Sequence, residues 1–202
     1  MTSDDVATWV AERWPVDPAN VAVERLTGGM INDVFRVDLG DTRVIVKHAR
    51  PYVVTVPDVA LSTRRLAIEA RCLRELGPDG CLVDVCDAGV GVPRHIDFDA
   101  AASVLVMEDC GVIPDLSDRM TSAAPLDAGL GAALGAFTAR LHAISAGCPD
   151  LLDELENRDV QETRARTQYG QVGAWVQALG RSDQAEVAHR AVELGQRLLA
   201  PG

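Results

Sequence analysis

The stretch Leu26–Lys47, LTGGMINDVFRVDLGDTRVIVK, decides the fold of this chain. It is expected to form a strand, a glycine turn, a second strand, a tight turn at positions 40–41, and a third strand that ends on Lys47. Gly28 and Gly29 form the first turn, where glycine permits positive φ and lets a ligand approach the backbone closely. A β-hairpin that merely carries a surface lysine is the alternative interpretation.

The composition limits the possible functions. The chain has 202 residues, 48% of them hydrophobic, enough for one sizeable core or two small lobes. Its net charge of −11, from 30 acidic and 19 basic residues, argues against nucleic acid and anionic membranes as general partners. Because neither a signal peptide nor a membrane-spanning apolar run is found, we expect a cytoplasmic protein.

The five cysteines favour free thiols over a disulfide framework or a zinc site. Their number is odd and no two form a C-x-x-C pair; they are Cys72, Cys81, Cys86, Cys110 and Cys148. This usage is typical of a reducing compartment.

Glu69 is the residue of interest in a predicted helix, Ser62–Leu76. It shares a face with Leu66 and Leu73, so its carboxylate lies on the apolar side. Burying an unpaired charge is expensive, and Lys47 is the natural partner. Such a lysine–glutamate pair positions phosphates in kinases. The alternative is that Glu69 lies at the edge of the apolar stripe and is solvated.

The remaining segments are predicted as follows. Ser3 is expected to cap a first helix, and the segment holding Pro51 and Pro57 to be a loop. Strands are expected at Leu82–Val85, at Arg94–Phe98 and, fully buried, at Ser103–Met107.

The polar link Glu108–Gly111 is interpreted as a hinge between lobes, whose backbone can hydrogen-bond an adenine edge. Beyond it only helices are expected: an amphipathic helix at Leu126–Ile144, further helix over Leu151–Leu179, and a last helix capped by Ser182.

Five segments carry a family resemblance: Leu26–Val37, Val44–Ala49, Arg64–Ala70, Ser103–Gly111 and Leu134–His142. In this order they resemble the aminoglycoside phosphotransferase and choline kinase-like family, which has a protein-kinase-like fold. The run V-K-H-A followed by P-Y-V looks most similar to the methylthioribose kinase-like branch. The resemblance implies an α+β fold, with a nucleotide-binding antiparallel lobe and one lobe helix at residues 1–110. A partial helical C-terminal lobe would follow at 111–202.

The resemblance also implies a cofactor, a substrate and site residues. Family members transfer the γ-phosphate of ATP to a hydroxyl of a small metabolite or aminoglycoside-like compound, and Mg²⁺ is expected with the nucleotide. The implied cofactor-binding residues are Gly28, Gly29, Asn32, Lys47, Glu69, Met107, Glu108 and Cys110. The first three would line the loop over the phosphates, the lysine would contact the α- and β-phosphates, and the glutamate would hold the lysine. The last three would meet the adenine. ATP and GTP both remain open.

The family's catalytic loop, H-G-D-x-x-x-x-N, has no match in the sequence. The one histidine-x-aspartate, His95–Asp97, lies before the predicted hinge, so no catalytic residue and no protein metal ligand is assigned. We therefore expect a C-terminally truncated kinase with little turnover by itself. Its helix at 126–144 would expose an apolar stripe, which favours self-association or a complementing C-lobe partner.

Two other functions remain open. The chain could be a pseudokinase that holds nucleotide and regulates a partner. It could also be a structural α+β domain in which the lysine and the glutamate coincide by chance. ATP binding separates this last possibility from the other two.

Overall fold

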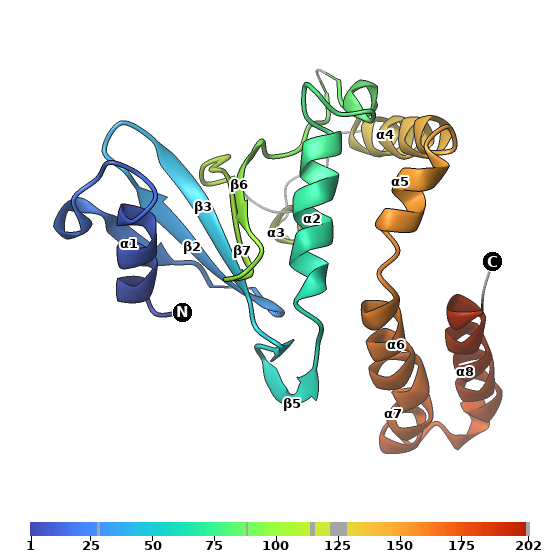
Figure 1. Cartoon of the computed structure of the whole chain (residues 1–202). Coiled ribbons are helices and arrows are strands. Elements are labelled where there is room, and N and C mark those ends of the chain that lie inside the picture. The colour runs from blue at the N-terminus through green and yellow to red at the C-terminus, as the bar shows by residue number, and fades with distance from the viewer. Residues whose placement is uncertain (28, 88, 114–115, 122–128, 201–202) are drawn as a thin grey trace.

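A five-stranded sheet occupies the first half of the chain (Figure 1). The computed structural model describes residues 1–27, 29–87, 89–113, 116–121 and 129–200. All neighbouring strands are antiparallel, in the order β1-β2-β3-β7-β6. The strands are β1 (Ala22–Arg25), β2 (Asn32–Asp38), β3 (Arg43–Ala49), β6 (His95–Asp99) and β7 (Val104–Glu108). Every described element from Leu116 onward is helical, so the α+β fold expected from the sequence is confirmed.

One face of the sheet packs against the first helix, α1 (Ser3–Ala11). Side chains alternate between the two faces of a strand, so every second residue of β3 and β7 points the same way. The buried core on this side joins helix residues to strand residues: Val6, Trp9, Val10, Phe35, Val37, Val44, Val46, Val104 and Val106.

The opposite face packs against α2 (Arg64–Glu75). Ile45, Leu105 and Met107 are buried there with Leu66 of the helix. By the same alternation, Lys47 lies on the α2 side of the sheet. The strand pattern thus places the lysine against the helix that carries Glu69 (Figure 1).

The start of α1 differs from the prediction that Ser3 caps it. Thr2 is the N-cap: its hydroxyl accepts the Asp5 N–H at 3.1 Å, and the Asp5 carboxylate accepts the Thr2 N–H at 2.7 Å. This reciprocal pair is a capping box, which requires an acceptor side chain three residues after the cap. Asp5 stands in that relation to Thr2.

Two further predictions in this half are wrong. The loop expected around Pro51 and Pro57 contains a two-stranded ribbon, β4 (Tyr52–Val53) and β5 (Val56–Ala60). A two-stranded ribbon leaves edge positions where the missing N–H of proline is tolerated. The strand expected at Leu82–Val85 is a 3₁₀ turn, Val83–Val85. Leu82 and Val85 are buried against helices rather than paired in the sheet, and Val83 is exposed.

The second half consists of helices: α3 (Leu116–Thr121), α4 (Gly129–Ser145), α5 (Pro149–Glu154), α6 (Arg158–Thr167), α7 (Val172–Ala178) and α8 (Ala185–Leu199). Shorter 3₁₀ turns occur at Pro18–Asn20, Tyr169–Gln171 and Ser182–Gln184. The N-cap of α8 is Gln184, not Ser182. The predicted start of the α4 helix at Leu126 lies outside the described residues.

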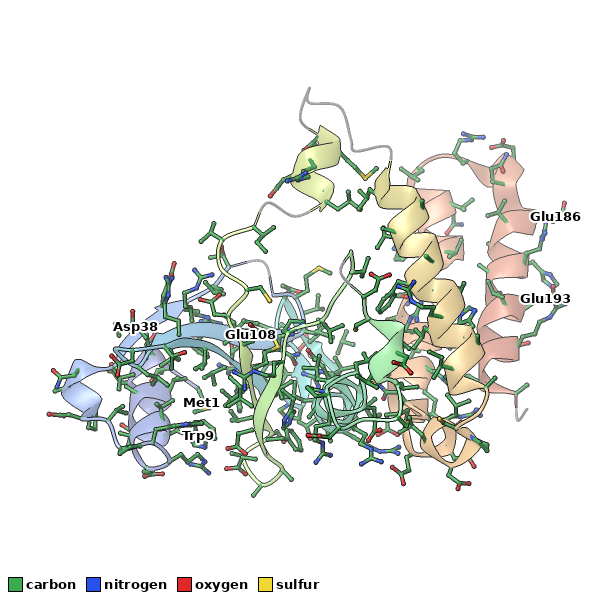
Figure 2. The ribbon with its side chains drawn as sticks, turned by 90° about the horizontal axis from the view of Figure 1, so that it is seen from above. Met1, Trp9, Asp38, Glu108, Glu186 and Glu193 are labelled. Carbon is green, nitrogen blue, oxygen red and sulfur yellow. The ribbon has the colours of Figure 1, made fainter. Side chains whose placement is uncertain are left out.

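Two groups of contacts organise these helices. Phe137, Leu141 and Ile144 of α4 pack on the buried cluster of Leu82, Val85 and Leu151. α8 packs against α6 and α7, and its Glu186 and Glu193 point away from them (Figure 2). Within the described part of the chain, none of the helices is long and apolar enough to cross a bilayer.

Candidate functional site

The centre of the candidate site is an ion pair between the sheet and α2. The Lys47 ammonium donates to Glu69 Oε1 at 2.6 Å. Both side chains remain partly open, with exposed fractions of 22% and 35%. The pair expected from the sequence is therefore present, and a ligand can reach it.

Lys47 is the only lysine in the 202-residue sequence; every other strongly basic side chain is arginine. A lysine ammonium is a compact point charge, whereas a guanidinium is a planar fork suited to bidentate partners. The chain therefore keeps the compact cation at a single position, facing Glu69. Binding the oxygens of a polyphosphate through a point charge is one chemistry that suits this choice.

The glycine turn precedes β2. A Cβ added to Gly29 would lie 2.8 Å from the Asn32 carbonyl oxygen, so no side chain fits there without a backbone shift. Gly28 lies outside the described residues. The turn is held to the β4–β5 ribbon, where the Thr55 N–H donates to the Met30 carbonyl at 3.3 Å. The ribbon, absent from the sequence prediction, therefore supports the glycine turn.

Asn32 has a partner inside the protein. It is buried at the start of β2, and its Oδ1 accepts from Arg65 Nε at 3.2 Å and from an Arg65 terminal nitrogen at 2.9 Å. The Arg65 guanidinium also donates to four backbone carbonyls, those of Ile31, Arg50, Leu61 and Ser62.

Through these hydrogen bonds Arg65 connects the chain at three places: after the glycine turn, after β3 and after the ribbon. Burial lowers the pKa of Arg65, and Glu69 partly offsets this. The sequence does not reveal the role of Arg65, because an arginine in the first turn of a helix is expected to be solvent-exposed unless its hydrogen-bond acceptors are known.

An apolar shelf lies beside the ion pair. Leu26 and Val34 are partly buried and pack against the cluster that contains Ile45 and Met107. Met107 is buried opposite Ile45 in the sheet. These side chains come from the β1 end, β2, β3 and β7, and Val34 is the strand partner of Lys47.

The predicted hinge follows β7. Glu108 is exposed, and its carboxylate accepts the Arg94 N–H at 3.0 Å while its own N–H donates to the Arg94 carbonyl at 2.9 Å. Cys110 is exposed with a free thiol. Gly111 has φ +82°, a conformation that favours glycine. The link therefore turns at Gly111, directly after the exposed Cys110.

Asp109 anchors this link and was not singled out from the sequence. Its Oδ2 accepts Arg36 Nε at 2.8 Å and its Oδ1 accepts an Arg36 terminal nitrogen at 3.3 Å. The Asp109 side chain is 4% exposed. Burial opposes its ionisation, but the hydrogen bonds from Arg36 and Gly111 outweigh burial and hold the pKa of Asp109 below its usual value. No local pattern reveals this pair, because its partners are far apart in the chain.

A second buried carboxylate lies on the α1 side of the sheet. Asp33 accepts from Arg25 and Arg50, each at 2.6 Å, and lies 3.6 Å from the N-terminal amine. Burial opposes its ionisation, yet the hydrogen bonds from Arg50 and His48 outweigh it and lower the pKa of Asp33. This cluster ties the N-terminus to β2 and faces away from Lys47.

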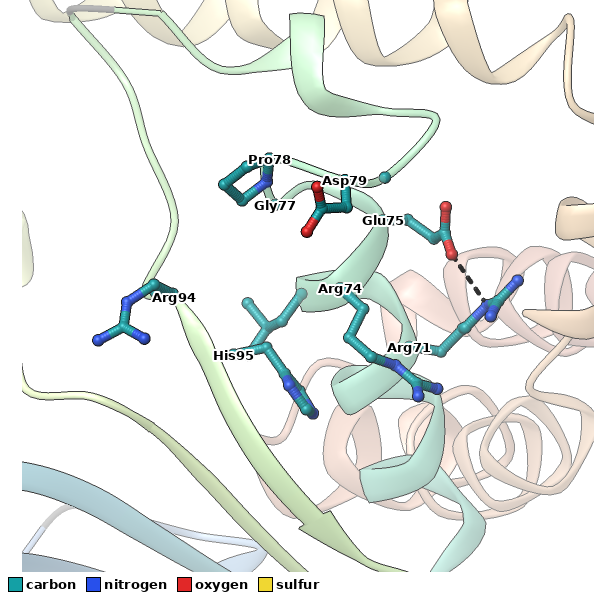
Figure 3. Close-up of a pocket in the computed structure, with 10 residues that line it drawn as sticks. Arg71, Arg74, Glu75, Gly77, Pro78, Asp79, Arg94 and His95 are labelled. Atoms are coloured by element: carbon teal, nitrogen blue, oxygen red, sulfur yellow. Dashed lines mark ion pairs between the residues drawn. The ribbon is translucent and has the colours of Figure 1, made fainter.

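A basic cavity of about 350 Å³ lies at the C-terminal end of α2. Figure 3 shows Arg74, Arg94 and His95 around it, and Arg71 paired with Glu75 at 3.2 Å. It includes none of the residues implied for nucleotide binding. His95 and Asp97 lie on the edge strand β6, paired with Met107 and Val106 of β7.

The described residues contain no metal site built from protein side chains alone. Among them, no group of three or more histidine, cysteine, aspartate or glutamate side chains could hold a metal ion. The partly exposed Lys47 ammonium and the partly buried apolar side chains of Leu26 and Val34 are groups that suit the phosphates and the base of a nucleotide.

Comparisons with known proteins find kinases and phosphotransferases that are similar to this chain. Residues 22–200 match the family model described as "Phosphotransferase enzyme family". A 4-hydroxytryptamine kinase of Psilocybe cyanescens is 31% identical over 150 residues, which cover 70% of this chain and 42% of that protein. A 4-hydroxytryptamine kinase of Psilocybe cubensis is 30% identical over 152 residues, covering 71% and 42%.

A third relative is the phosphotransferase FrzJ of a Cladobotryum species, 31% identical over 171 residues, covering 72% of this chain and 43% of that protein. The chain thus spans 42–43% of the length of these curated relatives.

Proposed function

Because this chain belongs to the phosphotransferase enzyme family, we propose that it binds the nucleotide of a small-molecule kinase. Residues 1–110 form the nucleotide-binding lobe and residues 111–202 a helical segment. The 2.6 Å contact between Lys47 and Glu69 is the observation that carries this function. In kinases that pair directs the lysine to the α- and β-phosphates.

The other site residues have complementary roles. The backbone of Gly28 and Gly29 covers the phosphates, with Asn32 holding the end of that turn through Arg65. Met107, Glu108 and Cys110 border the adenine, whose faces contact the apolar shelf. The contacts of Gly29, Asn32 and Met107 support these roles. ATP, with Mg²⁺ held chiefly by its phosphates, is the proposed nucleotide.

The acceptor is a hydroxyl on a small molecule. The two Psilocybe relatives are named for phosphorylation of 4-hydroxytryptamine, which makes an alcohol or phenol acceptor the favoured class. Transfer also requires a general base and metal ligands, and the sequence contains no H-G-D-x-x-x-x-N segment. We expect the 202 residues to turn over well below the ~1–100 s⁻¹ typical of kinases.

Nucleotide-dependent stabilisation tests the proposal. ATP with Mg²⁺ is expected to raise the melting temperature of the 202-residue chain, and Lys47→Ala to remove that rise without changing the melting temperature of the free protein. Equal stabilisation of the wild type and the variant would overturn the role of Lys47. No stabilisation of the wild type would favour a structural α+β domain over a nucleotide-binding one.

Exposed apolar residues on the C-terminal helices support self-association or a complementing partner. Leu134 is 43% exposed on α4, and Trp175 and Leu179 are 52% and 76% exposed at α7 and its end. Exposed apolar side chains at these positions are candidates for contacts with a second chain. We expect sedimentation velocity to show concentration-dependent association. A single monomeric species over a hundred-fold concentration range would contradict this.

A further inference from the structure

We propose that the cavity between the β4–β5 ribbon and α6 holds the apolar body of the acceptor alcohol. The cavity measures about 450 Å³. Its walls come from four parts of the chain: the glycine turn, the ribbon, α2 and α6. This assignment rests on the proposed phosphotransferase function and names the substrate class that the same site takes.

The size and lining suit a small organic ligand. Ligand pockets range from about 300 to 1,000 Å³ and are lined mostly by apolar side chains with a few polar groups. Here the apolar lining is Met30, Ile31, Val53, Val56, Val59, Leu61 and Val160. Threonines from α6, at 163 and 167, add hydroxyls on one side. A body of one or two fused rings fits this space and chemistry.

The charges at the cavity argue against a highly charged acceptor. Three charged side chains line it: Arg65, Glu69 and Arg164. Arg65 donates to five acceptors of the protein, Glu69 holds Lys47, and Arg164 donates to Gln168 at 3.2 Å. Each charge therefore already has a partner. A polycationic aminoglycoside would need free carboxylates, which the described lining residues do not supply.

The cavity adjoins the Lys47–Glu69 ion pair, which is the phosphate end of the proposed nucleotide site. Glu69 lines the cavity and also accepts from Lys47. Met30 lines it and is held to the ribbon tip by Thr55. The glycine turn thus serves both sites, covering phosphates on one side and walling the acceptor on the other. An acceptor seated with its body in the cavity has its hydroxyl end near the ion pair.

α6 closes the outer side through a direct contact with the ribbon. The Thr163 hydroxyl donates to the Ala60 carbonyl at 3.4 Å. Because the ribbon and α6 belong to the two halves of the chain, the cavity exists only where both halves meet. Binding of an apolar ligand there is expected to stabilise the contact between them.

Methyl-resolved NMR of the 202-residue chain tests the assignment, with 1-naphthol as the probe and ribose as the polar control. 1-Naphthol is expected to shift the methyl signals of Ile31, Val53, Val59 and Val160 saturably, and ribose to leave them unchanged. The methyls of Val187 and Val192 on α8 are the internal control and should not move. The assignment would be overturned if 1-naphthol shifted none of the cavity methyls or shifted the α8 methyls equally. It would also be overturned if ribose shifted the cavity methyls instead.

Matched variants separate this assignment from the nucleotide site. Val160→Asn is expected to weaken 1-naphthol binding at least ten-fold, while Val187→Asn at the exposed control position changes it less than two-fold. Val59→Asn provides the second variant should Val160→Asn fail to fold. Full nucleotide stabilisation with no 1-naphthol binding would overturn only the acceptor cavity. If the wild type showed neither nucleotide stabilisation nor 1-naphthol binding, the proposed function would be overturned as well.

Discussion

Lys47 and Glu69, 22 positions apart in the sequence, meet at 2.6 Å between the third strand and the second helix. The lysine is on the α2 side because strand residues alternate, and the glutamate is on the sheet side because it shares a helical face with Leu66 and Leu73. Each charge is partly open to solvent, so the pair is both formed and accessible.

Nucleotide should protect Lys47 from acylation. Lys47 and the N-terminal amine are the two amines in the sequence, so peptide mass spectrometry after limited acetylation reports both. ATP at ten times its Kd is expected to slow acetylation of Lys47 about ten-fold, because only the free fraction reacts. The N-terminal amine, which lies 3.6 Å from Asp33 on the other face, is the internal control. Equal protection of both amines would contradict nucleotide binding at Lys47.

Glu69→Gln should weaken nucleotide binding without unfolding the chain. Removing the charge releases the lysine from its position, and a loss of about 1.4 kcal/mol corresponds to a ten-fold higher Kd. Isothermal titration calorimetry measures the change. Glu75→Gln on the same helix is the matched control, since Glu75 pairs with Arg71 and lies outside the proposed site. If both variants lowered affinity equally, the effect would belong to the helix rather than to the pair.

Arg65→Met should destabilise the fold strongly. Arg65 is 6% exposed and donates to five acceptors. Each buried polar group left unpaired costs about 1–3 kcal/mol, so we expect the free energy of unfolding to fall by at least about 3 kcal/mol. Urea denaturation measures this. Arg64→Met, at the exposed neighbouring position, should change it by less than about 0.5 kcal/mol; similar losses in the two variants would refute a special role for Arg65.

Asp109 should make the fold sensitive to acid. Its pKa in the folded chain is below the ordinary value of 3.8. Above that value the carboxylate is ionised in both states and its contribution is complete. As the pH falls through about 4 the unfolded chain takes up the proton first, so stability decreases.

Urea denaturation between pH 6 and pH 3 tests this, with Asp109→Asn as the comparison. The variant is expected to lose less stability over that range than the wild type, although it starts from a lower value at pH 6. Asp33 contributes in the same direction in both proteins, because its pKa is also lowered. Parallel curves of unfolding free energy against pH would show that the Arg36–Asp109 pair makes no pH-dependent contribution to stability.

The sequence predicted the parts of the site that follow from local periodicity. The glycine hairpin, the strand that ends on Lys47 and the apolar spacing around Glu69 were together enough to predict the ion pair by analogy with kinases. The buried run at Ser103–Met107 was enough to predict the strand before the proposed hinge. The ribbon at Tyr52–Ala60 was missed because two prolines read as a loop. The apolar run at Leu82–Val85 was predicted as a strand because short apolar runs do not distinguish sheet pairing from helix packing.

The amino-acid sequence by itself determined the order of elements, the acidic surface and the position of the single lysine on the third strand. These depend on neighbours within a few residues and on composition. Only the tertiary structure decided that Arg65 ties three chain segments together, that Arg36 holds Asp109, and that the ribbon and α6 enclose a cavity. Those features depend on partners tens of residues away, whose distance is set by packing of the whole chain rather than by any local pattern.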